Sequence, residues 1–515
     1  MSIVTSIFKI LSQSMLDSLE SNRREPDKFQ DKWFGKLMAN GSQTSFGKEH
    51  GFTPKTTYRQ FSNQVPLRNY DMIEPYIVRT REGQQNVLWN SPVTWFAKSS
   101  GTSSAKSKFI PVTKESLHTC HYAGMQKMLA TYVHNNPSTK IFDGDALTLG
   151  GSVTPDELGT GKSNYGDLSA ILLSNSPFWV ELRRVPDKKS ALTSDFEKKV
   201  KIICENALRY NVTNFSGVPS WNLVLIKRIL EYAGKSNLKE VWPNLELFMH
   251  GGINFEPYRN EYKKILPGYM NYMENYNASE GYFAFQDDPA DKSMLLLTDN
   301  GVFYEFIPLE MLEKAISGNY TSFETVQSVK TGVNYALVIT TNGGLWRYLI
   351  GDSIMFTSLS PHKFIITGRT QLYINAFGEE LMIHNAEKAL AEACNTHNIT
   401  VNNYTVAPVF MAGNKKGYHQ WLVEFENEPE NIESFRHTLD NAIRSTNSDY
   451  DAKRTNDTTM TELQIVTIKK GVFYKWFFIK GKLGGQNKVP RLSNDRKYAT
   501  ELLELNHMDN ADHTI

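Results

Sequence analysis

The sequence has few cysteines and almost no net charge. Its 515 residues include three cysteines, Cys120, Cys204 and Cys394, whose wide separation excludes a metal-binding spacing and a disulfide framework and predicts a reducing compartment. The formal net charge is +1, from 56 lysines and arginines against 55 aspartates and glutamates. Such a balance offers no electrostatic basis for binding nucleic acid or an anionic membrane.

The sequence also lacks export and membrane signals. No apolar run approaches the roughly 18–20 residues that a membrane-spanning helix needs. The first eleven residues have neither a basic region nor a small-residue cleavage site, and their apolar spacing is that of an amphipathic helix. We therefore expect a cytoplasmic protein without a membrane or nucleic-acid partner, and nothing implies an obligate protein partner.

What is present indicates a multidomain α/β protein. A chain of 515 residues is too long for one hydrophobic core, so two or more domains are expected. Residues 1–90 have a mostly helical pattern, and beyond them short apolar runs alternate with amphipathic stretches, which indicates an α/β sheet. The expected helices cover 114–135, 195–210 and 220–234, and the expected strands cover 93–97, 147–149, 214–217 and 245–250.

The pattern changes after residue 280. Asn-Gly pairs at 300–301 and 342–343 separate apolar runs and predict two β-hairpins, 294–307 and 335–350, of an antiparallel subdomain. A boundary is expected near Gly368-Arg369, which gives an N-terminal domain of residues 1–368 and a small, mobile α+β C-terminal domain of residues 369–515. The latter is expected to contain helices at 384–396, 431–446 and 495–505 and strands at 404–411, 418–426 and 463–468.

A loop of small and hydroxyl-bearing residues follows the first expected strand. It consists of Ser99, Ser100, Gly101, Thr102 and Ser103, followed by Lys106 and Lys108. Such a loop presents backbone N–H groups, hydroxyls and a lysine to an anion, so it predicts a phosphate site, although a solvated serine-rich turn has the same pattern. It is not a Walker motif, and the Gly-Lys-Ser at 161–163 has Asp156 where that motif requires glycine.

Residues 276–281, Tyr-Asn-Ala-Ser-Glu-Gly, follow a strand that ends in Gly251-Gly252. Glycines let a backbone approach a flat ring closely, and the face of Tyr276 can stack on such a ring. The carboxylate of Glu280 suits a hard divalent cation beside phosphates. These residues indicate a nucleotide and metal site, while a tight turn and a surface carboxylate are the alternatives.

Two later motifs add charged groups. Residues 347–352 end an apolar strand in Gly-Asp, so Asp352 is expected at a sheet rim, where its carboxylate can accept hydrogen bonds from both ribose hydroxyls. An Asx turn that closes the strand is the alternative. Lys488 lies in the glycine-rich segment 484–491, from which a mobile lysine can deliver charge to a phosphate transition state. A solvated loop lysine is the alternative.

The order of these motifs resembles one enzyme family. Residues 99–103, 276–280, 348–352, 368–369 and 487–491 match in type and order the motifs of the auxin-responsive acyl-acid amido synthetases, the Gretchen Hagen three family. The resemblance covers essentially the whole chain. It implies the fold of the acyl-adenylate-forming superfamily, which includes acyl-CoA synthetases and luciferases. It also implies an ATP- and Mg²⁺-dependent activation of a carboxylic acid as acyl-AMP, followed by conjugation to an amine, usually an amino acid.

The resemblance assigns a role to each motif: the serine-rich loop to the phosphates, Tyr276 to adenine, Glu280 to Mg²⁺ and Asp352 to ribose. Lys108 and Lys488 are the expected catalytic residues, and Arg369 is expected at the interdomain hinge. The expected nucleotide-binding residues are Ser99, Ser100, Gly101, Thr102, Ser103, Gly251, Gly252, Tyr276, Ser279, Glu280, Asp352 and Arg369. The expected acyl-pocket residues are Met125, Val218 and Trp221, which core packing explains equally well.

Two departures from the plant pattern bear on the substrate. Ser104 and Ala105 stand where plant members have glycines, and Phe377-Gly378-Glu379-Glu380 stands where they tend to carry a lysine. These departures favour a bacterial-type member and argue against plant hormones as substrates. Two other functions stay open: an acyl-CoA synthetase, which would form a thioester, and a silent nucleotide-binding scaffold, against which the acidic and basic motif residues argue.

Overall fold

The computed structural model describes residues 3–99, 108–158, 163–252, 255–370, 373–374, 376–377, 379, 381–410, 416–455, 460–481 and 489–511. The chain forms two compact units. The large unit comprises Met1–Val218, Val224–Gly252 and Leu266–Ile366, and the small unit comprises Pro219–Leu223, Ile253–Ile265 and Thr367–Ile515. The chain therefore passes between the units more than once, whereas we expected a single crossing at 368–369, and that domain boundary stays a prediction.

The large unit begins with five helices, as the pattern of residues 1–90 predicts. They are α1 (Ile3–Arg24), α2 (Pro26–Gly41), α3 (Ser45–Glu49), α4 (Tyr58–Gln64) and α5 (Tyr70–Arg81). Local sequence fixes several of their starts, since Thr57 and Gln60 form a capping box on α4 and the Asn69 side chain accepts from Met72 N on α5. The apolar residues near the start of α1 are not all buried, since Ile10 and Leu11 are mostly exposed.

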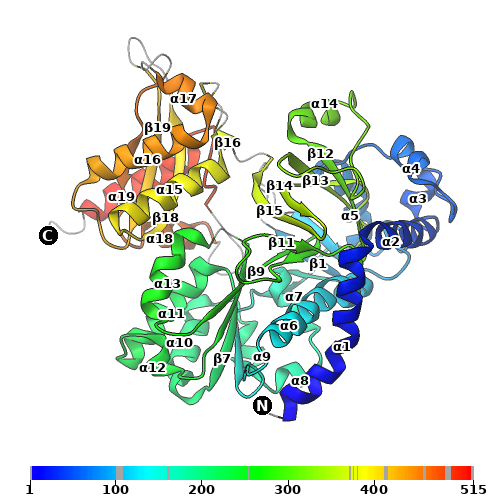
Figure 1. Ribbon diagram of the computed structural model, residues 1–515, viewed down its shortest axis with the longest axis horizontal. Coiled ribbons are helices and arrows are strands. Elements are labelled where there is room, and N and C mark those ends of the chain that lie inside the picture. The colour runs from blue at the N-terminus through cyan, green and yellow to red at the C-terminus, as the bar shows by residue number, and fades with distance from the viewer. Residues whose placement is uncertain are drawn as a thin grey trace. The chain divides into compact units, whose positions relative to one another are not determined.

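The core of the large unit is one eleven-stranded sheet with the order β12-β13-β14-β15-β11-β10-β9-β8-β7-β3-β6 (Figure 1). The strands β6, β3, β7, β8 and β9 pair in parallel, and pairing from β9 through β10 and β11 to β15, and from β12 through β13 to β14, is antiparallel. The parallel strands are β3 (Asp145–Thr148), β6 (Arg184–Val185), β7 (Val212–Gly217), β8 (Leu247–Gly251) and β9 (Asn271–Ala278). The others are β10 (Gly281–Phe285), β11 (Met294–Leu296), β12 (Val302–Pro308), β13 (Asn334–Thr341), β14 (Tyr348–Leu359) and β15 (His362–Arg369).

A second sheet of four strands, in the order β2-β1-β5-β4, carries the serine-rich loop. Its strands are β1 (Trp95–Ser99), β2 (Lys108–Val112), β4 (Val153–Pro155) and β5 (Asn164–Gly166). The helical elements that follow are the π-helix η1 (Ser116–Tyr122), α6 (Ala123–Asn135), α7 (Leu168–Ser174), α8 (Phe178–Glu181), α9 (Lys188–Ala191), α10 (Phe196–Asn206), η2 (Ala207–Arg209), α11 (Pro219–Ala233), α12 (Leu238–Val241), η3 (Glu256–Tyr258), α13 (Arg259–Ile265), η4 (Leu309–Met311) and α14 (Leu312–Ile316).

One of the two predicted hairpins is wrong. The strands on either side of residues 298–301 do not pair with each other: β11 pairs with β10 and β15, and β12 pairs with β13. The connecting residues are held by other elements, because Asp299 accepts hydrogen bonds from Asn22 of α1 and from Lys127 of α6, and Asn300 donates to Tyr282 O. The second hairpin is confirmed, with Val338 opposite Leu349.

The small unit has an α+β core of its own. Its three-stranded sheet has the order β18-β19-β20, with β18 and β19 antiparallel and β20 parallel to β19. Helices α15 and α16 contribute apolar residues to a core shared with that sheet, including Leu390, Phe435 and Trp421. The elements are β16 (Tyr373–Ile374), β17 (Leu381–Met382), α15 (Ile383–His397), β18 (Val401–Val409), β19 (Tyr418–Phe425), α16 (Ile432–Thr446), α17 (Ser448–Arg454), β20 (Gln464–Thr467), α18 (Val472–Ile479) and α19 (Lys497–Ala511). No described helix is long and apolar enough to span a membrane.

Candidate functional site

The ends of the parallel strands lie in register. Gly217 of β7 is opposite His250 of β8, and Gly251 is opposite Asn275 of β9. A side chain at Gly251 would not fit, because a Cβ there would lie 2.4 Å from Asn275 O, and Gly252 has a φ of +81°. Ligands of α/β sheets bind at the carboxyl ends of parallel strands, so the predicted Gly251-Gly252 pair stands where a nucleotide is expected.

The structure brings Tyr276 and Asp352 together. The Tyr276 hydroxyl donates a hydrogen bond to Asp352 Oδ2, although the two residues are 76 positions apart and their strands, β9 and β14, are not neighbours in the sheet. Both residues are buried, and the Tyr276 ring packs edge-on against Phe283 at a centroid distance of 4.9 Å. Two motifs assigned separately to adenine and ribose therefore form one polar centre.

Ser279 and Glu280 form the two-residue turn between β9 and β10, since Ala278 pairs with Gly281. Ser279 is buried and Glu280 is partly exposed. Among the described residues no group of three metal-ligating side chains comes together. A site with one protein carboxylate nevertheless fits Mg²⁺, because this ion commonly takes one or two carboxylates and fills its other positions with substrate phosphates and water.

The serine-rich loop joins two paired strands. Ser99 ends β1 opposite Lys108, the first residue of β2, so the loop ends are held together. The side chain of Ser99 and residues Ser100, Gly101, Thr102 and Ser103 lie outside what the structure describes. A hydrogen bond from α5 holds the start of β2: Phe109 N donates to Tyr70 Oη over 2.8 Å. The Lys108 ammonium lies 5.8 Å from the Tyr70 ring centroid.

Buried charged groups lie beside strand β1. Asp167 follows Gly166, which pairs with Ala97 of β1. Burial raises the pKa of the Asp167 carboxyl, while the Ser152 N–H, Lys199 and Lys98 oppose that rise. Burial also lowers the pKa of Lys199 to about 8, and its ammonium donates to Gly150 O. The sequence motifs gave no sign of this cluster.

A further buried ion pair adjoins the same strands. Arg81 binds Asp156 through two hydrogen bonds of 2.7 and 2.9 Å, and its guanidinium lies 3.7 Å from the Phe109 ring centroid. Asp156 entered the sequence analysis only as the residue that rules out a Walker motif. In the fold, its ion pair with Arg81 joins the end of α5 to the segment between β4 and β5.

Three more of the predicted residues are described at least in part and belong to different elements. Met125 of α6 is partly buried against the main core, and Val218 is the N-cap of α11. Arg369 is the last residue of β15. The side chains of Arg369 and Trp221 and the whole of Lys488 lie outside the described residues. The predictions for these three residues therefore stay predictions.

Sequence reasoning missed a contact beside Tyr276. Asn277 Oδ1 lies 2.8 Å from Nδ1 of His121, a buried residue of the π-helix η1. His121 entered the sequence analysis only as one position of an amphipathic helix. A π-helical turn is a rare element that often marks a functional site, but it leaves no recognisable pattern in the sequence.

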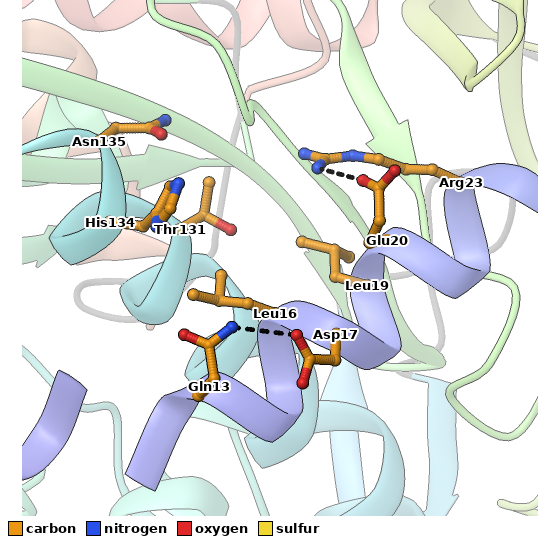
Figure 2. Close-up of a pocket in the computed structure, with 9 residues that line it drawn as sticks. All are labelled: Gln13, Leu16, Asp17, Leu19, Glu20, Arg23, Thr131, His134 and Asn135. Atoms are coloured by element: carbon orange, nitrogen blue, oxygen red, sulfur yellow. Dashed lines mark hydrogen bonds and ion pairs between the residues drawn. The ribbon is translucent and has the colours of Figure 1, made fainter. Parts of the chain in front are cut away.

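A pocket elsewhere in the large unit holds none of the predicted residues. Figure 2 shows it between α1 and the end of α6. The cavity has a volume of about 220 Å³. Its charged and amide groups on α1 pair within that helix: Gln13 donates to Asp17 over 3.0 Å, and Arg23 contacts Glu20 at 3.4 Å. Arg23 also pairs with Asp287 at 2.7 Å. The pocket therefore offers no free cluster of charged groups on its α1 side.

Comparison with known sequences decides the family. The pattern of the GH3 family N-terminal domain matches residues 15–270, that of the central domain matches 295–369 and that of the C-terminal domain matches 384–497. The chain belongs to the GH3 family. The expected resemblance is confirmed, and the match spans both of the compact units.

Members of the GH3 family in plants are similar over nearly the full length. The indole-3-acetic acid-amido synthetase GH3.3 of Arabidopsis thaliana is 23% identical, with 92% of this chain and 90% of the relative covered. The jasmonoyl–L-amino acid synthetase JAR6 of Nicotiana attenuata is also 23% identical, with 94% of each covered.

Two solved structures show the same fold. The GH3.15 acyl acid amido synthetase in complex with 2,4-DB superposes with a TM-score of 0.79 at 18% identity, covering 96% of both chains. A 2-hydroxyisobutyryl-CoA ligase in its postadenylation state superposes with a TM-score of 0.59 at 11% identity, covering 95% of this chain and 93% of the ligase. The predicted adenylate-forming fold is thereby confirmed.

Proposed function

We propose that this GH3 family member is an acyl-acid amido synthetase, which activates a carboxylic acid with ATP and joins the acyl group to an amine, an amino acid being the expected class. The observation that carries the proposal is the hydrogen bond between Tyr276 and Asp352. It unites two separate nucleotide motifs beside Gly251-Gly252, at the strand ends where this fold class binds ligands. The named plant relatives support the amide product.

The first half-reaction forms the acyl-adenylate. A carboxylate oxygen of the acid attacks the α-phosphorus of ATP, the bond to the bridging oxygen breaks, and pyrophosphate leaves. The protein's part is positioning and charge neutralisation. We assign the phosphates to the serine-rich loop and Lys108, the ribose to Asp352 and the adenine to Tyr276. Lys488 is assigned to the same transition state when the small unit closes.

Mg²⁺, held by Glu280, would neutralise phosphate charge in this step. The position of Glu280 supports the assignment, because the turn between β9 and β10 places its carboxylate three residues after Asn277 and four after Tyr276. We expect a carboxylate that lies so near the proposed adenosine site in the chain to share an ion with the phosphates of the same nucleotide.

The second half-reaction forms the amide. The amine nitrogen attacks the acyl carbonyl, the acyl–phosphate bond breaks, AMP leaves, and the nitrogen loses its extra proton. Closure of the small unit over the intermediate would exclude water and protect it from hydrolysis. We expect the hinge for this movement near Arg369, at the end of β15.

The proposal is tested with a panel of carboxylic acids, ATP and Mg²⁺, each with no acceptor, with mixed amino acids or with CoA. Pyrophosphate release is measured, and products are identified by mass. We expect release with at least one acid and an amide product with amino acids. A thioester with CoA and no amide would establish the acyl-CoA synthetase instead. No release with any acid would contradict the proposal, and Asp352→Ala is the negative control.

A further inference from the structure

Strand β14 carries a bulge at the residue that we assign to ribose. Its pairing with β13 is regular on both sides of residues 350–352, but these three residues stand opposite Leu337 alone. Two extra residues are thus inserted into β14, and Asp352 is one of the three. Because the insertion is even, the side chains before and after it keep the sheet face that strand alternation gives them. The bulge therefore disturbs the ladder only at Ile350, Gly351 and Asp352.

The bulge contains a backbone conformation that favours glycine. Gly351 has a φ of +91°, in the left-handed region that residues with a Cβ atom rarely adopt. Asp352 follows directly and is buried. The conformation at Gly351 thus sets the direction in which the chain enters Asp352. A side chain at position 351 would draw φ toward negative values and turn the next residue away from its present direction.

The carboxylate of Asp352 meets a side chain from a distant strand. It accepts a hydrogen bond from Tyr276 of β9, while β15, β11 and β10 lie between β14 and β9 in the strand order. In a flat sheet, strands four places apart are about 19 Å apart, too far for these two side chains to meet. The sheet therefore curls between β9 and β14, and a bulge increases local twist in this way.

Aromatic rings line the path from β9 to β14. The Tyr276 ring packs edge-on against Phe283 of β10 at a centroid distance of 4.9 Å and against Phe364 of β15 at 6.3 Å. Phe364 in turn lies 6.1 Å from Phe356 of β14. These contacts hold the Tyr276 ring in place, so the alignment of Asp352 with its hydroxyl depends on the backbone of β14.

We propose that Gly351 is a positioning residue for ATP, whose left-handed backbone within the β14 bulge aims the Asp352 carboxylate at the ribose hydroxyls. The inference rests on the proposed function, because Asp352 is assigned to ribose only there. On this account Gly351 acts through Asp352 and not by contact with the substrate. A change at Gly351 should therefore alter the recognition of ribose and leave the choice of acid as it is.

Nucleotides that lack one ribose hydroxyl test the inference. Pyrophosphate release is measured with an accepted acid and mixed amino acids, using ATP, 2′-deoxy-ATP or 3′-deoxy-ATP. In kcat/KM the wild type should favour ATP over at least one analogue by roughly ten- to hundredfold, the range for a hydrogen bond to a charged group. Gly351→Ala should bring that ratio near one, mainly by loss with ATP.

Gly332→Ala is the matched control for backbone strain. Gly332 has a φ of +76°, lies two residues before β13, and donates to Phe356 O of β14 over 3.1 Å. A Cβ at Gly332 would meet no atom within 4 Å outside the adjacent residues. The variant should keep the wild-type ratio even if it lowers the melting temperature.

Two results would overturn the inference and leave the proposed function intact. One is an unchanged ratio in Gly351→Ala, and the other is a ratio that falls equally in both glycine variants. No pyrophosphate with any acid would contradict the proposed function instead.

Asp352→Asn shows whether Gly351 acts through the carboxylate. In that background, adding Gly351→Ala should lower kcat/KM for ATP much less than it does in the wild type, because both changes remove the same contact. Equal reductions in the two backgrounds would show that Gly351 acts by another route, which would overturn the inference.

Gly351→Asn covers the case in which Gly351→Ala does not fold, because asparagine enters the left-handed region more readily than alanine. Its usual left-handed φ of about +57° differs from that of Gly351, so its ratio should lie between the wild-type value and one. An unchanged ratio in this variant would overturn the inference. Equal use of ATP and both analogues by the wild type would do so without any variant.

Discussion

Neighbouring residues of strand β9 make contacts of two different kinds. Tyr276 donates to Asp352 of β14, and Asn277 bonds to His121 of η1. Successive side chains of a strand point to opposite faces of its sheet, so one short segment serves two partners. The first contact joins two motifs that the sequence analysis had singled out. The second joins Asn277, a residue of the 276–281 motif to which the sequence analysis gave no role, to His121, which lies outside every motif.

The difference separates what is constant in the proposed reaction from what varies. ATP is the same for every adenylate-forming enzyme, so the residues that would hold it are recognisable by type and order. The acid differs between enzymes, and a residue that selects it has no reason to follow a shared pattern. Changes on the Asp352 side should therefore affect all acids equally.

The largest effect is expected from Asp352→Ala. Loss of two charge-assisted hydrogen bonds to ribose, at about 1.5–3 kcal/mol each, should lower kcat/KM for ATP about a hundredfold or more, with every acid alike. Steady-state kinetics with several acids is the measurement. Tyr276→Phe keeps the ring and removes only the hydroxyl, so its kcat/KM for ATP should fall much less. If the fall in kcat/KM for ATP in Asp352→Ala varied widely with the acid, the assignment of Asp352 to the shared nucleotide would be contradicted.

Glu280→Gln should impair Mg²⁺-dependent adenylation by about tenfold to a hundredfold, because the amide lacks the charge of the proposed ligand. The concentration of Mg²⁺ needed for half-maximal pyrophosphate release should rise, and the melting temperature should change little since Glu280 lies in a turn. If the variant melts much earlier yet keeps full specific activity, Glu280 is a structural residue.

Lys108→Ala should weaken the use of ATP by about ten- to a hundredfold, because one cationic contact to phosphate, worth about 1.5–3 kcal/mol, is lost. The control is Lys114→Ala, an exposed lysine shortly after the same strand. Kinetics at varied ATP distinguishes them. Unchanged KM and kcat in Lys108→Ala would refute its assignment to the phosphates.

The last prediction concerns stability and pH, not activity. The pKa of His121 is about 4 in the folded protein, below its ordinary value of 6.5, so the unfolded chain binds the proton more readily. The stability that this neutral ring contributes is fully present above pH 6.5 and is lost as the pH falls toward 4, by up to roughly 3 kcal/mol. Denaturant unfolding of the wild type and His121→Phe between pH 4 and 7.5 measures it. Parallel pH profiles of the two proteins would show that His121 does not titrate in this way.

Family and fold class were predictable from the sequence, because the order of the motifs and the alternation of strands and helices can be recognised even where sequence identity to relatives is low. The ends of β7 and β8 were placed within two residues of their observed positions. The hairpin at 294–307 was wrong because the Asn-Gly signal is local, whereas Asp299 and Asn300 are held by distant residues of α1, α6 and β10. The Tyr276–Asp352 bond also depends on a path across non-adjacent strands, and motif order alone does not reveal it.

The His121–Asn277 contact and the cluster of Asp167 and Lys199 share the same reason for being missed. Each depends on burial and on residues far apart in the chain, and no spacing rule relates them. The assignments of the serine-rich loop, Arg369 and Lys488 remain predictions.

The central claim is that the acid is activated as an acyl-AMP and then becomes an amide. The most direct measurement supplies an accepted acid labelled with ¹⁸O in both carboxylate oxygens and follows the label by mass spectrometry. The account predicts that one ¹⁸O appears in the phosphate of AMP and the other stays in the amide carbonyl, with pyrophosphate unlabelled. Formation of ADP and labelled inorganic phosphate, or of unlabelled AMP beside the amide, would contradict it.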